Sequence, residues 1–216
     1  MKTKKLVTTA MLLAFALILS LIQIIKLPFG GSVTLVSMLP VILIGYMYGI
    51  KYGLCSAFVY SGLQMLVGFG TVSAFFLPGE SQMALTSAVI ICVIDYVLAY
   101  SVLGLGSVFK GKVKNDTLAF CLGVTVCILL RYIMHIISGY IFFGAWAEWF
   151  FADSTGLSQI GALKGFCSWV MSNFDGKSLS LFYSVIYNGS YMLPELIITL
   201  LVSPVVTRIL KKANIM

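Results

Sequence analysis

The sequence predicts an all-α integral membrane protein with six transmembrane helices and both termini in the cytoplasm. First, 60% of its residues are hydrophobic, only 10% are charged and the mean hydropathy is +1.05, whereas a soluble domain is usually about a quarter charged. Second, the apolar residues form long continuous runs, not the alternating segments of a β-barrel. Third, the basic residues gather at the ends of these runs, as they do in multi-pass proteins.

A helix needs about 20 mostly apolar residues to cross a bilayer, and the candidate runs approach or exceed that length. They are 6–27, 33–50, 52–70, 84–108, 117–143 and 181–209. The first is longer than a signal-peptide core and is interpreted as a retained helix. The second and third are short, and form either a tight helical hairpin or a partly re-entrant pair. Residues 1–216 are therefore interpreted as one membrane domain.

The distribution of positive charge indicates how the chain is oriented. In a six-span arrangement, ten of the fourteen basic residues fall on one side of the membrane. They are Lys2, Lys4, Lys5, Lys51, Lys110, Lys112, Lys114, Arg208, Lys211 and Lys212. The positive-inside rule places this side in the cytoplasm. The net charge of +7 thus reports the orientation of the chain in the lipid bilayer. It does not indicate a binding patch, and no nucleic-acid partner is expected.

The segment 145–180 is a long outer loop between the fifth and sixth spans. It mixes polar residues with aromatic ones and, with its flanks, contains all three tryptophans, Trp146, Trp149 and Trp169. Such a segment forms either an interfacial aromatic belt or a lid over an outward-facing pocket.

Four ionisable residues lie inside the predicted spans and away from their ends: Asp95, Arg131, His135 and Glu195. A charge near the bilayer centre costs about 2.5–3.5 kcal/mol on insertion scales, so such residues usually pair or mark a functional site. One interpretation is a structural ion pair of Arg131 with Asp95 or Glu195. The other is a polar site shared by several spans.

The spacing of the polar residues favours a shared site in the outer half of the membrane. His135 lies one helical turn outward of Arg131, on the same face. On the sixth span, Asn188, Tyr191 and Glu195 follow an i, i+3, i+7 pattern that forms one polar stripe. A carboxylate, an imidazole, an amide and several tyrosines suit a small, flat, cationic ligand.

Other chemistries are not supported by the sequence. Five cysteines without a CxxC pair and a single histidine predict neither a disulfide framework nor a metal site. The stretch Gly106–Val113 resembles a P-loop but has Val113 where Ser or Thr is required. The protein is therefore not expected to be an enzyme or to hold a cofactor, and its energy source is a gradient or another subunit.

The first span carries Ala10 and Ala14 in a small-xxx-small pattern. Such patterns allow helices to approach closely in lipid, where packing drives association. The alternative is chance, because alanine is common in membrane spans.

Four blocks of sequence resemble a known family. They are "GGSVTLVSMLPVILIGYMYGIKYG", "VIDYVLAYSVLGL", "RYIMHIISGYIFFG" and "YSVIYNGSYMLPE". They resemble the thiamine-specific substrate-binding subunit of energy-coupling factor transporters, over nearly all of the chain outside 145–180. The His-x-x-[Ser/Ala]-Gly and Tyr-Ser-x-x-x-Asn-Gly blocks are the more specific.

The resemblance implies a subunit of the bacterial plasma membrane that binds thiamine from outside. This subunit would dock on a transmembrane coupling subunit that is driven by two ATPase subunits. The residues that match the family's ligand site are Asp95, Tyr96, His135, Tyr183 and Asn188. The docking face would fall on Ala10 and Ala14.

The sequence also departs from the family pattern. The acidic residue is Asp95 where Glu is expected, and Tyr60 and Phe143 stand at aromatic positions where Trp is expected. A third such position falls near Gly31. The main alternative to a transport subunit is a stand-alone, gradient-driven permease for a small aromatic cation or vitamin. A third hypothesis is a scaffold whose polar residues only join the spans.

Overall fold

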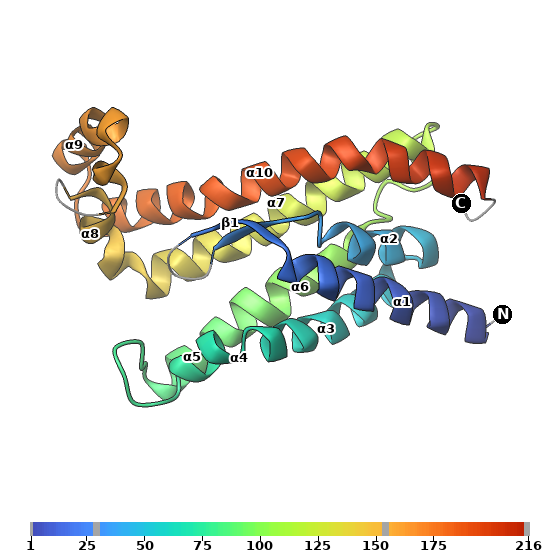
Figure 1. Ribbon diagram of the computed structural model, residues 1–216, viewed down its shortest axis with the longest axis horizontal. Helices are drawn as coiled ribbons and strands as arrows, with labels where there is room; N and C mark the ends of the chain where they lie inside the picture. The colour runs from blue at the N-terminus through green and yellow to red at the C-terminus, as the bar shows by residue number, and fades with distance from the viewer. Residues whose placement is uncertain (1, 28–30, 153–155, 214–216) are drawn as a thin grey trace.

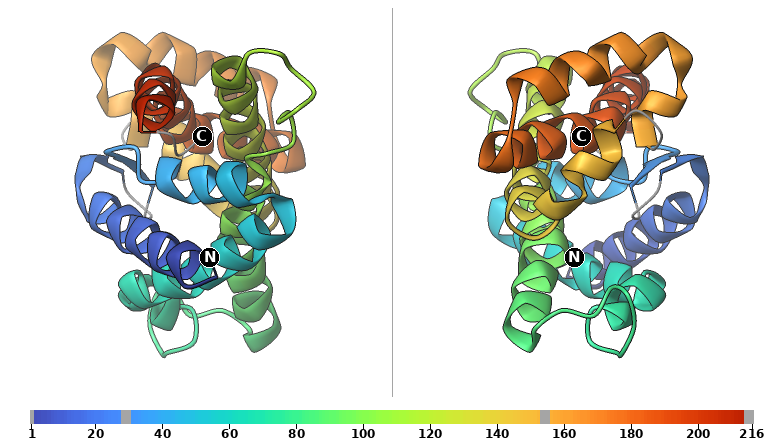
Figure 2. Two further views of the ribbon diagram at one scale, coloured as in Figure 1. Left: turned by 90° about the vertical axis from the view of Figure 1, so that its right-hand side faces the viewer. Right: turned by 90° about the vertical axis from the view of Figure 1, so that its left-hand side faces the viewer.

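The computed structural model describes residues 2–27, 31–152 and 156–213. These residues form an elongated bundle of helices (Figure 1). The longest helices, α7 (Asp116–Phe142) and α10 (Gly176–Lys212), lie side by side and run in opposite directions. Seen along the long axis, α1 (Lys2–Leu21) lies on one flank and the segment Leu85–Leu105 on the other (Figure 2).

Within the described residues, four helices are long and apolar enough to cross a membrane: Lys2–Leu21, Leu85–Leu105, Asp116–Phe142 and Gly176–Lys212. They correspond to the first, fourth, fifth and sixth predicted spans. The helical membrane class is thus confirmed, whereas the count of six stays a prediction. The second and third spans contain α2 (Leu39–Tyr48), of only 10 residues, and α3 (Ile50–Val67), of 18 residues.

The helices α2 and α3 pack against the end of the fourth span through glycines. A Cβ at Gly45 or at Gly53 would lie 2.3 Å from the backbone oxygen of Gly104. Only residues without a side chain permit this approach, which is the way that membrane helices gain packing contact in lipid. The two short helices are therefore held to the bundle by backbone contact.

The expected helix over 6–27 ends early, and the region that follows is a β-hairpin. Helix α1 stops at Leu21, and β1 (Gln23–Lys26) pairs antiparallel with β2 (Ser32–Thr34). Consecutive β-branched residues in β1 favour an extended chain, and pairing with β2 satisfies backbone groups that a helix would otherwise satisfy. The second span was predicted to start at residue 33. This position lies in β2, which pairs with β1 instead of starting a helix.

The fourth span is not a regular α-helix. It begins as α5 (Leu85–Ile91), widens into a π-helix, η2 (Cys92–Leu98), and continues as α6 (Ala99–Ser101) and the 3₁₀ segment η3 (Val102–Leu105). A π-turn changes the direction in which side chains project, and such turns are frequent at functional sites. Asp95 and Tyr96 both lie on it.

The segment between α7 and α10 folds into a small helical cap at the end of the bundle opposite the termini (Figure 1). Its elements are η4 (Gly144–Trp146), α8 (Ala147–Phe151), η5 (Gly156–Gln159), η6 (Gly161–Leu163) and α9 (Lys164–Asn173). The short helix α4 (Phe69–Ala74) and the turn after it lie near this end of the bundle. The segments that carry the ten basic residues lie at the other end, beside both termini.

Candidate ligand-binding site

A cavity of about 410 Å³ lies among the hairpin, α3, the π-helix, α7 and α10. Six of the seven residues predicted to contact a ligand line it, although they come from three separate spans. They are Asp95, Tyr96, His135, Phe143, Tyr183 and Asn188. The position expected near Gly31 also lies on the wall.

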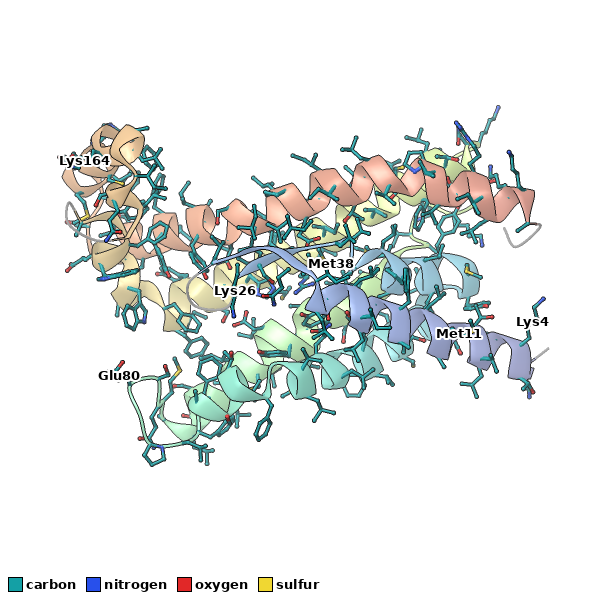
Figure 3. The ribbon with its side chains drawn as sticks, viewed as in Figure 1. Lys4, Met11, Lys26, Met38, Glu80 and Lys164 are labelled. Carbon is teal, nitrogen blue, oxygen red and sulfur yellow. The ribbon has the colours of Figure 1, made fainter. Side chains whose placement is uncertain are left out.

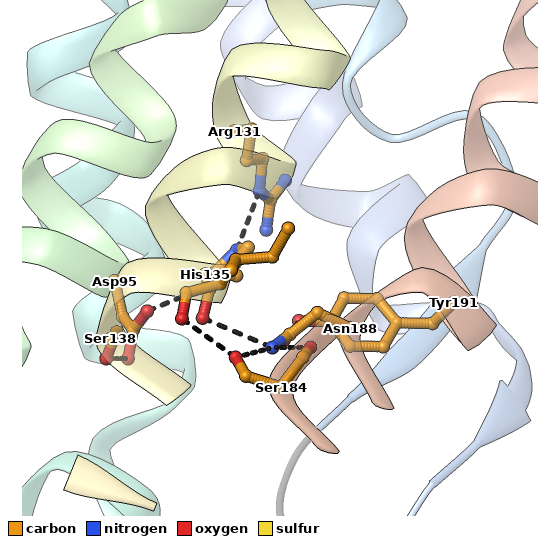
Figure 4. A network of polar contacts seen from close by, with 8 residues as sticks. Asp95, Arg131, His135, Ser138, Ser184, Asn188 and Tyr191 are labelled. Carbon is orange, nitrogen blue, oxygen red and sulfur yellow. Dashed lines mark hydrogen bonds and ion pairs between the residues drawn. The ribbon is translucent and has the colours of Figure 1, made fainter. Parts of the chain in front are cut away.

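A chain of polar contacts crosses one wall of this cavity (Figure 4). Asp95 Oδ1 lies 2.9 Å from His135 Nδ1, and Ser138 Oγ donates to Asp95 Oδ2 at 2.6 Å. On the far side of the ring, Arg131 Nε donates to His135 Nε2 at 3.3 Å. Because Nε2 accepts, the proton of the neutral imidazole is on Nδ1 and faces the carboxylate. His135 therefore joins a cation to an anion.

The amide of Asn188 is held in a single orientation. Its Nδ2 donates to the His135 backbone oxygen at 3.1 Å and to the Ser184 backbone oxygen at 2.9 Å. Its Oδ1 accepts from the Tyr191 hydroxyl at 2.6 Å. The close approach of α7 to α10 that allows these contacts depends on Gly139, where a Cβ would lie 2.3 Å from Ser184 Oγ. The amide thus reaches the cavity pre-oriented.

Tyr60, the seventh predicted residue, lies behind the cavity lining rather than on it. Its hydroxyl donates to the Ala16 backbone oxygen at 3.2 Å and accepts from Gln64 Nε2 at 2.6 Å. Its ring packs edge-on against Tyr100 at 5.5 Å. Gln64 and Tyr100 line the cavity themselves, so Tyr60 supports two lining residues.

Arg131 and Glu195 do not form the expected structural ion pair within the described part of the chain. The Arg131 guanidinium instead lies 4.0 Å from the centre of the Tyr100 ring, a cation–π arrangement. Glu195 Oε1 accepts hydrogen bonds from the Thr34 backbone N–H and hydroxyl. Each residue has local partners, because the hairpin brings donors to Glu195 and His135 gives Arg131 an acceptor.

Several cavity residues were not predicted from the sequence. Tyr100, Gln64 and Thr34 line it, and Lys26 extends from β1 at its edge (Figure 3). Tyr187 also lines it, and its hydroxyl accepts from the Gly31 N–H at 3.3 Å. Tyr100 follows Asp95 by five residues, the spacing of the i→i+5 hydrogen bond of a π-turn. A polar residue five positions after Asp95 was therefore the one signal in the sequence for Tyr100 as a lining residue.

The alanines of α1 face outward. Ala10 and Ala14 are exposed, and so are the larger apolar residues around them, including Met11 and Phe15. The described part of this chain therefore leaves a surface of α1 uncovered that combines small and large apolar side chains.

The fold and the cavity define a class of protein: a multi-pass membrane protein that encloses a cavity lined by polar and aromatic residues. The comparisons with known proteins then assign the family. Residues 6–149 match the model of the family described as thiamine transporter protein (Thia_YuaJ). Because this match covers more than half of the 216 residues, the chain belongs to that family.

The chain is also similar to two known ThiT proteins. The chain is 27% identical to the thiamine transporter ThiT of Bacillus subtilis (strain 168) over 209 residues, 92% of this chain and 87% of that protein. The solved structure of ThiT from Listeria monocytogenes has a TM-score of 0.59 and 23% identity, and the match covers 98% of this chain and 95% of that one. The latter supports the fold. The chain is thus a multi-pass bacterial membrane transport protein and not an enzyme.

Proposed function

We propose that this protein is the thiamine-binding subunit of an energy-coupling factor transporter. The observation that carries the proposal is the cavity that contains Asp95, His135 and Asn188, in a chain of the thiamine transporter family. Thiamine carries a fixed positive charge and two linked aromatic rings. The cavity offers two carboxylates for the charge and tyrosine rings for the planes of the ligand.

The hydrogen-bonding groups of the cavity suit an aminopyrimidine. Asp95 accepts hydrogen bonds, and the Asn188 oxygen, which accepts one from Tyr191, has a second lone pair for a ligand donor. Both are held by neighbours, Asp95 by His135 and Ser138, and Asn188 by Tyr191. A pre-oriented site loses less conformational entropy on binding than a flexible one, which favours tight capture of a dilute vitamin.

The topology proposed for this function has six crossings, with α2 and α3 as the second and third. Both termini and the ten basic residues then face the cytoplasm, and the cap of α8 and α9 faces outward. Phe150 of this cap lies 5.2 Å from Tyr183, ring centre to ring centre. Since Tyr183 lines the cavity, this contact supports a role for the cap as a lid.

The energy for transport is proposed to come from a coupling module with two ATPase subunits. The exposed face of α1 around Ala10 and Ala14 supports docking on a membrane partner, because small residues let helices approach closely. Thiamine would enter the cavity from outside and be released inward when the subunit is docked.

The ligand is tested by isothermal titration of the purified protein with thiamine. Asp95→Ala or His135→Ala is expected to weaken binding at least about tenfold, because each removes a charge-assisted contact. Glu80→Gln, in the turn after α4, is the control and is expected to leave binding unchanged. Absence of thiamine binding by the wild type overturns the proposal.

The energy source is tested in proteoliposomes. Uptake is expected only when the coupling and ATPase subunits are present. Uptake by this chain alone, abolished by a protonophore, would establish the gradient-driven permease instead.

A further inference from the structure

Glu195 is a buried carboxylate that the contacts described so far leave without a counter-charge. It lies on α10, the residue is 2% exposed and it lines the cavity. Oε1 accepts hydrogen bonds from the Thr34 backbone N–H and hydroxyl. Among the described residues, Oε2 has no hydrogen-bond donor, and no lysine or arginine forms an ion pair with Glu195.

The other charges of the cavity largely offset one another. Asp95 and Arg131 contact the same imidazole from opposite sides, so their charges are separated by one neutral ring. Lys26 is exposed on β1, where water and salt screen its charge. With the imidazole neutral, the buried groups around the cavity sum to one negative charge, and Glu195 is the carboxylate that forms no ion pair with another described residue.

An uncompensated charge in a low-dielectric site acts over several ångströms without direct contact. Glu195 follows Asn188 by seven residues, which is roughly 10 Å along the helix axis. Because Glu195 lines the same cavity, a ligand with two linked rings that is anchored by one ring at Asn188 and Asp95 can direct its second ring toward Glu195. In thiamine, that second ring is the one that carries the fixed positive charge.

We infer that Glu195 supplies the counter-charge for the cationic ring of the ligand, whereas Asp95 and Asn188 orient the neutral ring. The inference rests on the proposed function. It assigns different roles in ligand binding to the carboxylates of Asp95 and Glu195. Glu195 would then select a cationic ligand, although it is not among the residues that the family resemblance assigned to the ligand site.

The test compares thiamine with its uncharged thiophene isostere, using purified protein and isothermal titration. The measured quantity is the ratio of the two dissociation constants, isostere over thiamine. Glu195→Gln keeps the size of the side chain and an acceptor for Thr34, but removes the charge. The ratio is expected to fall by about tenfold, with little change in the affinity for the isostere.

Two control variants separate charge from structure. Glu148→Gln makes the same chemical change at an exposed position of α8 and is expected to leave the ratio unchanged. Asn188→Ala removes a neutral contact and is expected to weaken both ligands in parallel. A purely structural role for Glu195 would make Glu195→Gln behave like Asn188→Ala, which overturns the inference while the proposed function stands.

Arg131→Met provides a second test that does not depend on the folding of Glu195→Gln. It raises the buried negative charge from one to two, so the ratio is expected to rise by about tenfold. An unchanged or lower ratio contradicts the inference. Wild-type protein that binds neither ligand would overturn the proposed function, and this inference with it.

Discussion

The contact between α7 and α10 at Gly139 gives the sharpest test of how the bundle builds the cavity. A Cβ at this position would lie 2.3 Å from Ser184 Oγ, 3.1 Å from Ser184 Cβ and 3.1 Å from Asn188 Nδ2. Ser184 cannot move away freely, because it is fully buried and its hydroxyl donates to the Ile136 backbone oxygen at 2.8 Å. Gly139→Ala must therefore push the two helices apart.

The expected cost of Gly139→Ala is about 1–3 kcal/mol of unfolding free energy, the range for overpacking a tight core. This cost opposes the gain of up to about 1 kcal/mol that alanine brings to a helix through its propensity. The displaced Asn188 amide is also expected to weaken thiamine binding at least about tenfold, since tenfold corresponds to 1.4 kcal/mol. Thermal unfolding in detergent and isothermal titration measure the two effects.

A double-mutant cycle with Ser184→Gly identifies the cause. Removing the Ser184 side chain eliminates two of the three close contacts, so the double variant is expected to regain about 1–2 kcal/mol relative to additivity. Gly62→Ala on α3 is the matched control, because a Cβ there meets nothing within 4 Å. Destabilisation of Gly62→Ala by as much as Gly139→Ala, or strict additivity in the cycle, would refute the packing argument.

Three further outcomes are expected. Tyr187→Phe removes the acceptor for the Gly31 N–H and should speed thiamine dissociation several-fold, since a hydrogen bond contributes about 1 kcal/mol; an unchanged off-rate in stopped-flow fluorescence contradicts this. Ala14→Trp on the exposed face of α1 should abolish co-purification with the coupling module and leave thiamine affinity unchanged, whereas Phe58→Trp on the exposed surface of α3 should affect neither. Phe150→Ala removes the ring beside Tyr183 and Tyr187 and should weaken thiamine binding about fivefold, because edge-to-face pairs contribute about 0.5–1.5 kcal/mol each; equal titration curves for variant and wild type would argue against the cap as a lid.

Most of the membrane class and much of the cavity follow from the sequence. Long apolar runs predict spanning helices because the bilayer sets their length, and four of the six predicted runs are such helices. Polar residues inside an apolar run can also be recognised from the sequence. Asp95, His135 and Asn188 stand out in apolar surroundings, and their depth follows from helix spacing alone, so their convergence on one cavity was predictable.

The partner of each ionisable residue was decided by the tertiary structure. Arg131 pairs with neither predicted carboxylate, because His135 and the Tyr100 ring lie closer to its guanidinium. Glu195 bonds to Thr34, which lies 161 positions away in the sequence. Hydropathy and helical periodicity are properties of a short window, and they carry no information about contacts at that separation.

The hairpin and the π-turn show the same division between local and long-range causes. The sequence predicted spans over 6–27 and from residue 33 onward, whereas β1 forms because β2 returns to pair with it. The π-turn aims Asp95 and Tyr96 at the cavity, and hydrophobic spacing does not distinguish it from a regular helix. The sequence by itself therefore determined the class of protein and the depth of its polar groups. Packing between distant segments decided which of those groups meet.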